Sequence, residues 1–182
     1  MNTFQTRRLL RPLLLLVGAF ALAACGFHLR QTASLPPQMQ RTHLSVSGGG
    51  DFQRHLARAL QTSGVIVEDD TGPGIAELRV PVARFSTETL SAGGYARITE
   101  YAVRYHVEFD VTDAAGITLL PRQRIDMSRE YSYDASNSVG NEAQVAEIQR
   151  SLNSDMVQAI LFRLEAAGKH EIQSPTGTAG TR

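Results

Sequence analysis

The chain contains a single cysteine, Cys25, and this scarcity excludes several kinds of site. One thiol cannot form an intramolecular disulfide, and a zinc site built on a Cys-x-x-Cys pair is equally impossible. The five histidines are dispersed, and no two of them form an HExxH or HxH motif. Because the GxSxG, GxGxxG and EF-hand motifs are missing as well, the sequence predicts no catalytic residue, no metal site and no bound cofactor. It thus favours a protein that is not an enzyme.

An excess of charge of one sign is also lacking, since 18 Lys and Arg residues balance 18 Asp and Glu residues. The first 24 residues hold three of the arginines and no acidic residue. The remainder therefore has 15 basic residues against 18 acidic ones, a net charge of about −3. Non-specific binding to nucleic acids depends on neutralising phosphates. A slightly acidic remainder argues against a nucleic-acid partner.

Long hydrophobic runs are missing too. The apolar run Leu13–Leu22 would extend only about 15 Å as a helix, roughly half of a bilayer core, so a membrane-spanning helix is the weaker interpretation. The run follows a basic segment, residues 1–11, and this order is typical of an export signal. We interpret residues 1–24 as a signal peptide. The Arg7-Arg8 pair fits an ordinary basic leader better than twin-arginine export.

Small residues lead from this run directly into the cysteine, with the sequence LAAC at residues 22–25. These four residues resemble the bacterial lipobox, whose cysteine is acylated with diacylglycerol and becomes the first residue of the mature protein. The resemblance implies that Cys25 carries a covalent lipid; a small buried thiol is the alternative. Two or more acyl chains would anchor the protein stably. Because Gly26 rather than Asp follows, resemblance to sorted lipoproteins implies the outer membrane.

The spacing of apolar residues in the rest of the chain predicts four strands and two helices. Residues 97–111 are the clearest strand, because apolar side chains from Tyr101 to Val111 alternate strictly with charged ones from Glu100 to Asp110. Pro81 cannot donate to a strand ladder, so it predicts a sheet edge or a bulge. The segment VIVED, residues 65–69, is compatible with an extended conformation but is not counted as a strand. The predicted strands are 41–47, 78–90, 97–111 and 123–133, and the predicted helices are 51–63 and 141–167.

Each predicted helix has one apolar face, so both should lie on the same side of the sheet. The predicted fold class is α+β: a two-layer sandwich with two helices on one face of a four-stranded, mixed, mostly antiparallel sheet. The other face of the sheet should be polar and wet. Along the chain we predict a lipidated tether at 25–40, the α+β domain at 41–167 with its last helix ending near Gly168, and a disordered tail at 168–182.

The motif CGFHLR at residues 25–30 resembles the mature N-terminus of the LptE family of lipopolysaccharide-assembly lipoproteins. The segments SGVIVED and TEYAVRYHVEFDV are similar to that family as well, and the element order over residues 25–167 resembles its fold. The resemblance implies a non-enzymatic lipoprotein on the periplasmic side of the outer membrane. Such a protein plugs the lumen of the LptD β-barrel, helps it assemble and assists lipopolysaccharide delivery to the outer leaflet. Its expected partners are an LptD-like barrel, lipopolysaccharide and, through the lipid on Cys25, the membrane.

The family also binds lipopolysaccharide through basic residues near a hairpin tip and in the loop before the last helix. Only Arg97, beside the tip SAGGYAR, matches that pattern, because the loop SNSVGNE has no basic residue. A guanidinium at Arg97 can bind a phosphate in a bidentate manner, and an ordinary solvated charge is the alternative.

The alternative function of the whole protein is a lipid-anchored periplasmic ligand-binding or envelope-maintenance module without a barrel partner. A deep apolar pocket would favour that module, whereas a packed interior with a polar exterior favours the plug.

Overall fold

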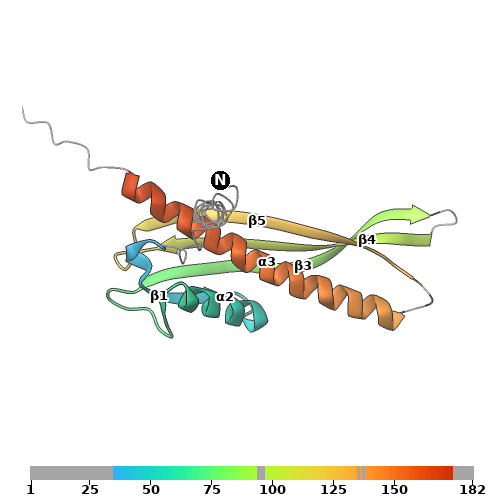
Figure 1. Cartoon of the computed structure of the whole chain (residues 1–182), viewed down its shortest axis with the longest axis horizontal. Helices are drawn as coiled ribbons and strands as arrows, with labels where there is room; N and C mark the ends of the chain where they lie inside the picture. The colour runs from blue at the N-terminus through green and yellow to red at the C-terminus, as the bar shows by residue number, and fades with distance from the viewer. Residues whose placement is uncertain (1–34, 94–96, 135, 137, 174–182) are drawn as a thin grey trace, which may run out of the picture. The chain divides into compact units, whose positions relative to one another are not determined.

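The computed structural model describes residues 35–93, 97–134, 136 and 138–173, all of which belong to the unit Ala33–Arg182 (Figure 1). None of the helices in these ranges is long and apolar enough to span a membrane. The elements are η1 (Pro37–Met39), β1 (Arg41–Val46), α2 (Gly50–Thr62), β2 (Ile66–Glu68), β3 (Ala76–Gly93), β4 (Arg97–Thr112), β5 (Thr118–Ser132) and α3 (Ser138–Gln173).

The sheet has five strands in the order β2-β1-β3-β4-β5. β1 is parallel to both β2 and β3, whereas β3, β4 and β5 are antiparallel neighbours. The α+β class and the mixed sheet are confirmed, but the prediction of four strands is wrong. The missed strand, β2, lies in VIVED and pairs Ile66 with Arg41. Three residues are too few to show an alternating pattern, so only the pairing with β1 identifies them as a strand.

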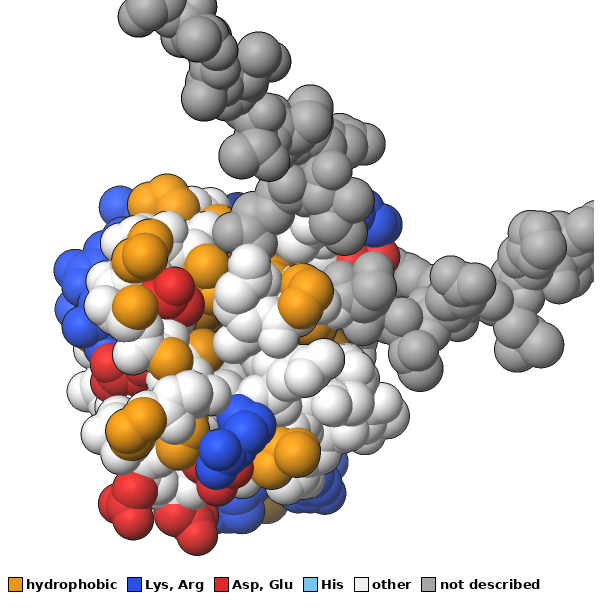
Figure 2. All heavy atoms as spheres, turned by 90° about the vertical axis from the view of Figure 1, so that its left-hand side faces the viewer, with side chains coloured by type: hydrophobic (Ala, Val, Ile, Leu, Met, Phe, Trp, Pro, Cys, Tyr) orange, Lys and Arg blue, Asp and Glu red, His pale blue; other side chains and the backbone are white. Residues whose placement is uncertain are grey.

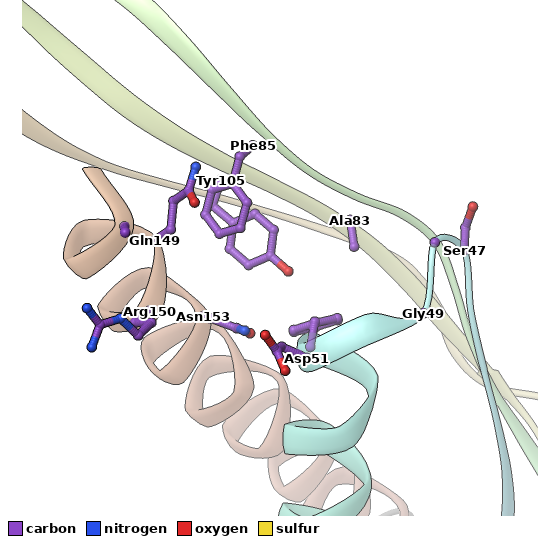
Figure 3. A pocket seen from close by; sticks show the side chains of 12 residues that line it. Ser47, Gly49, Asp51, Ala83, Phe85, Tyr105, Gln149, Arg150 and Asn153 are labelled. Atoms are coloured by element: carbon purple, nitrogen blue, oxygen red, sulfur yellow. The ribbon is translucent and has the colours of Figure 1, made fainter. Parts of the chain in front are cut away.

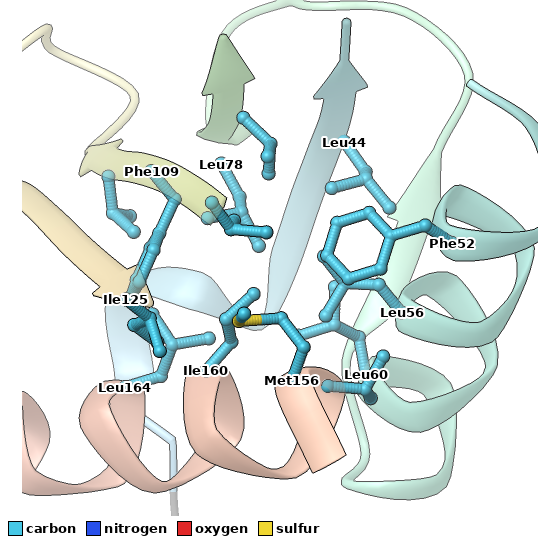
Figure 4. Close-up of a cluster of buried hydrophobic side chains, with 14 of the residues drawn as sticks. Leu44, Phe52, Leu56, Leu60, Leu78, Phe109, Ile125, Met156, Ile160 and Leu164 are labelled. Atoms are coloured by element: carbon cyan, nitrogen blue, oxygen red, sulfur yellow. The ribbon is translucent and has the colours of Figure 1, made fainter. Parts of the chain in front are cut away.

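Both helices cover the same face of the sheet, as predicted (Figure 1). α2 packs on β1 and β2, α3 packs on β4 and β5, and the two helices contact one another. The core between these layers is apolar (Figure 4). The alternation predicted for β4 is confirmed, because Val103, Val107, Phe109 and Val111 are fully buried.

Pro81 lies in a bulge. β3 is a central strand, and its register with β4 shifts between Arg79 and Val82, so the proline sits where a ladder hydrogen bond is not required. The extra residue also reverses which side chains face inward. Leu78 and Val80 are buried, but after the bulge it is Ala83 and Phe85, rather than Val82, that pack against the core. Val82 therefore does not continue the apolar face formed by Leu78 and Val80.

The predicted boundaries of the domain are too narrow at both ends. Met39, predicted to lie in the tether, is buried in the core, and its backbone carbonyl accepts a hydrogen bond of 2.8 Å from the Thr42 hydroxyl. α3 continues to Gln173, past the predicted end at Gly168. A Cβ atom at Gly168 would lie 3.1 Å from the Pro36 backbone nitrogen, so this glycine allows close packing and does not end the helix. Residues 1–34 and 174–182, which include the predicted signal peptide and most of the predicted tail, lie outside the described residues.

This contact predicts that Gly168→Leu displaces the segment before β1. The Met39 amide donates a hydrogen bond of 2.9 Å to the Pro36 carbonyl, and a leucine side chain at position 168 would push Pro36 away. Hydrogen exchange at the Met39 amide should therefore become about tenfold faster or more, as expected for a local opening made easier by over 1 kcal/mol. The matched control is Lys169→Leu at the exposed neighbouring position. Equal exchange in both variants would contradict the packing role of Gly168.

Candidate functional site

The face of the sheet opposite the helices is built from charged side chains on three neighbouring strands. Strand pairing sets His106 beside Asp126, and it sets Glu108 beside Arg124. Sequence alternation predicted the charged residues of β4 on this face, but their partners on β3 and β5 become apparent only from the strand register. We call this surface the outer sheet face, and it comprises Arg79, Arg84, Glu88, Ala102, Arg104, His106, Glu108, Asp110, Arg122, Arg124 and Asp126.

Asp110 is the most buried charge on the outer sheet face, with only 6% of its surface exposed. Arg79 donates to its Oδ2 from both Nε, at 2.9 Å, and Nη2, at 2.5 Å. Arg122 Nη2 lies 3.5 Å from the other carboxylate oxygen, Oδ1. The hydrogen bond to Asp110 raises the pKa of the Arg79 guanidinium above its ordinary value. This face was predicted to be polar and wet as a whole, but on it two arginines cover Asp110 and compensate its charge.

His106 continues the pairing along the same face. Its Nδ1 lies 2.7 Å from Asp126 Oδ1, and its Nε2 lies 3.4 Å from Glu108 Oε1. Arg124 Nε donates to Asp126 Oδ2 at 2.7 Å, and this hydrogen bond, followed by that of His106, lowers the pKa of Asp126. A carboxyl whose pKa is lowered by folding stabilises the fold at neutral pH, and this contribution is lost as the pH falls through the lowered pKa.

Exposed large apolar side chains are few and spread over the described surface. They are Ile66, Leu90, Ile117, Tyr133, Val139 and Phe162, which belong to β2, β3, α3 and two loops. Figure 2 shows the end of the domain formed by η1 and the β4–β5 loop, where charged side chains of both signs lie among hydrophobic ones. Within the described part of β4, no large apolar side chain is exposed. The outer sheet face is therefore a charge-paired polar surface.

The two site residues predicted from sequence are not part of this network. Arg97 is the first residue of β4 and pairs with Gly93 across the hairpin, so its backbone lies near the tip as expected. Its side chain, like the whole of Cys25, lies outside the described residues. In the ranges that the structure describes, no group of three or more His, Cys, Asp or Glu residues is arranged to hold a metal ion.

The fold defines the class of the protein as a two-layer α+β sandwich with a polar outer sheet face. A family model described as "LptE: Lipopolysaccharide-assembly" matches residues 31–164. The chain belongs to the LptE family, as the resemblance of its residues predicted. The description of this family names the assembly of lipopolysaccharide and no chemical reaction.

Curated relatives and solved structures agree with this assignment. The LPS-assembly lipoprotein LptE of Yersinia enterocolitica is 27% identical over 168 residues, which cover 90% of this chain and 80% of the relative. The solution structure of lipoprotein B from Nitrosomonas europaea has a TM-score of 0.67 at 23% identity, over 80% of this chain and 96% of that one. Rare lipoprotein B from Shewanella oneidensis has a TM-score of 0.62 at 18% identity, over 74% and 99% of the two chains. At these identities the structural likeness shows the fold alone.

Proposed function

We propose that this protein is an outer-membrane lipoprotein, anchored on the periplasmic side through a lipid on Cys25, that occupies the lumen of an LptD-like β-barrel. In this position it helps the barrel assemble and assists delivery of lipopolysaccharide to the outer leaflet. The role is structural and requires no catalytic residue. Membership of a lipopolysaccharide-assembly family supports the proposal.

The outer sheet face is the observation that carries the plug proposal. The lumen of a transmembrane β-barrel is polar and in contact with water, so a plug needs a polar surface against the wall. On this face Arg104 pairs with Glu88 at 2.6 Å and Arg79 pairs with Asp110, so the charges are largely compensated within the domain. A surface of paired charges can approach a polar wall without burying an isolated charge.

Co-purification of the full chain from outer membranes tests this function. We expect a large β-barrel to accompany the wild-type protein. Ala102 is 3% exposed and lies between Glu88 and Glu130 on the neighbouring strands. Because Glu88 is already paired with Arg104, Ala102→Arg adds bulk to the outer sheet face with Glu130 as the neighbouring opposite charge. This variant should recover about tenfold less barrel, as expected when a central interface position is obstructed.

Ala115→Arg provides the matched control, because it adds the same side chain in the exposed β4–β5 loop. It should recover as much barrel as the wild type. If the wild-type protein is isolated alone, the plug proposal fails. If both variants behave like the wild type, the outer sheet face is not the surface that contacts the barrel.

We further propose that Arg97 contacts a phosphate of lipopolysaccharide at the hairpin tip. Arg97→Glu replaces a potential bidentate donor with a repulsive charge, so the affinity of the full chain for lipopolysaccharide should fall about tenfold. Arg58→Glu, which makes the same charge change at an exposed position on α2, should leave the affinity unchanged. Equal affinities for all three proteins would refute the role of Arg97 and leave the plug proposal intact.

One observation favours the second candidate function, a lipid-anchored ligand-binding module without a barrel partner. A pocket of about 400 Å³ lies between the helices and the sheet, and its lining is partly aromatic and partly polar. This size falls in the range of small-molecule sites, about 300–1,000 Å³. The co-purification experiment separates the two functions, because only the plug requires the barrel.

A further inference from the structure

The pocket lies where α2 begins, and three elements form its walls (Figure 3). The sheet contributes Phe85 and Tyr105, the start of α2 contributes Gly49 and Asp51, and α3 contributes Arg150 and Asn153. α2 starts only at Gly50, and its residue Phe52 reaches Tyr105 from one side, so the pocket opens between the start of α2 and α3. Small residues at positions 48, 49, 83 and 146 leave the volume unfilled.

Asn153 is a buried polar side chain without a full set of partners. It is only 8% exposed, and its Oδ1 has no hydrogen-bond partner among the described residues. Figure 3 shows its amide extending from α3 towards the start of α2. Buried polar groups in proteins are almost always hydrogen-bonded, so an unpaired one at the wall of a pocket is a group that a bound ligand or an ordered water would complete.

Further hydrogen-bonding groups converge on the same space. Gly49 precedes α2 and provides no side-chain cap, so the first amide groups of this 13-residue helix remain available as donors. The Tyr105 hydroxyl points into the pocket (Figure 3), and burial raises the pKa of Tyr105, so this hydroxyl stays protonated and can donate. The Asp51 carboxylate and Asn153 Oδ1 are acceptors. A ligand must therefore offer both donors and acceptors.

The charges at the pocket are already paired within the domain. Asp51 forms an ion pair with Arg54, and Arg150 Nη2 lies 2.8 Å from Glu147 Oε2. Asp51 also supplies the negative charge that the start of α2 favours. An anionic ligand would meet the Asp51 carboxylate and a cationic one would meet Arg150. The pocket therefore favours a ligand without net charge.

The sheet side of the pocket is an aromatic platform. Phe85 and Tyr105 stack with their ring centroids 3.9 Å apart and their planes inclined by 11°, and Phe52 meets the edge of Tyr105 at 5.7 Å. The faces of aromatic rings carry partial negative charge and attract weakly positive C–H groups. A ring with an aliphatic C–H face fits this wall.

We propose that this pocket binds a saccharide, a neutral ring that carries several hydroxyl groups. Each hydroxyl can donate and accept hydrogen bonds, as Asp51, Asn153, Tyr105 and the start of α2 require. The C–H face of the sugar ring packs on the partly buried Phe85, whose ring is supported from behind by the buried Tyr105. The site is distinct from the hairpin tip at Arg97, and its occupation does not depend on a barrel partner.

Titration of the full chain with neutral sugars tests the proposal. The protein is labelled with ¹⁵N and kept in a detergent whose head group contains no sugar, and glucose, galactose and N-acetylglucosamine are added separately. At least one of them should shift the amide signals of Gly48, Gly49 and Asn153 in a saturable manner, with millimolar affinity. Asn153→Leu should weaken this binding about tenfold, as expected for one lost hydrogen-bonding group. The matched control is Gln144→Leu, at an exposed position on the same helix, and it should not change the affinity.

A second variant keeps the test decisive if Asn153→Leu fails to fold. Ala146 is exposed and lines the pocket, so Ala146→Phe fills the space without disturbing the core, and it should abolish the shifts. If none of the sugars shifts these signals, or if inorganic phosphate or acetate shifts them instead, the proposal is overturned. The affinity of the Asn153→Leu variant for lipopolysaccharide is measured as well. If the substitution weakens the binding of sugars but not of lipopolysaccharide, the ligand is a free saccharide. If it weakens both equally, the ligand is the sugar portion of that glycolipid. Both of these results support a saccharide site.

Discussion

Phe109→Ala should lower the free energy of unfolding by about 3–5 kcal/mol, the usual range for removing a large aromatic side chain from a packed core. Phe109 is fully buried and lies between the sheet and α3, near Ile125 and Leu164 (Figure 4). The replacement removes apolar contacts and leaves a cavity that the rigid β4 backbone cannot collapse to fill. Urea denaturation followed by circular dichroism measures the change as a lower midpoint.

The chain offers a matched control for this prediction. Phe162 belongs to α3 but is 63% exposed, so Phe162→Ala should change the stability by no more than about 0.5 kcal/mol. The difference between the two variants isolates the effect of burial from that of residue type. Similar denaturation midpoints for the two variants would contradict the described packing of β4 against α3.

Cys25→Ser should abolish acylation of the protein completely, because the serine hydroxyl does not replace the thiol that accepts the lipid. Cells labelled with an alkyne fatty acid should yield a labelled wild-type protein and an unlabelled variant. A protein that carries residues 26–182 behind a signal cleaved without lipidation should lose membrane binding by about two orders of magnitude in vesicle flotation.

Gly26→Asp serves as the control for the anchor. This variant retains Cys25 and should be labelled as strongly as the wild type, but it should fractionate with the inner membrane, since an Asp after the acylated cysteine resembles the retention signal. A wild-type protein without fatty-acid label would show that Cys25 is an ordinary thiol and would remove the anchor from the proposed function.

The parts of the fold that sequence predicted well are those in which one periodic pattern persists over many residues. β4 alternates without interruption from Tyr101 to Val111, and α3 repeats its apolar face from Val145 to Leu164. Such segments bury one face whatever their neighbours are, so local sequence is sufficient to identify them. The helices on a single face of the sheet followed from the same reasoning.

The errors arose where tertiary contacts decide the structure. β2 is defined by its pairing with β1 and has too few residues to show a period. The bulge at Pro81 was anticipated, but its effect on the inward face of β3 depends on the register with β4. Glycine is a residue type that often ends helices, but Gly168 lies inside α3 and contacts Pro36, which is more than 130 positions away in the chain. Local sequence carries no information about that approach.

The candidate site was predictable to a similar extent. The charges of β4 indicated a polar sheet face, whereas the burial of Asp110 by Arg79 and Arg122 required the positions of both neighbouring strands. The pocket was missed entirely, because Phe85, Gly49 and Asn153 come from three separate elements and form no motif. The lipopolysaccharide contact of Arg97 and the lipid on Cys25 remain predictions from the family resemblance, and the experiments described above test them.

The packing of Pro36 against Gly168 limits how far the domain can move from its anchor. Leu35 already packs against the core, so only the ten peptide units from Cys25 to Leu35 separate the proposed lipid anchor from the domain. Whatever path they take, ten units span at most about 36 Å, less than the full thickness of a bilayer with its head groups. A lipid on Cys25 would thus restrict the domain to a shallow layer beneath the membrane. Within that layer its effective concentration at a membrane-embedded partner would be far higher than that of a freely diffusing protein.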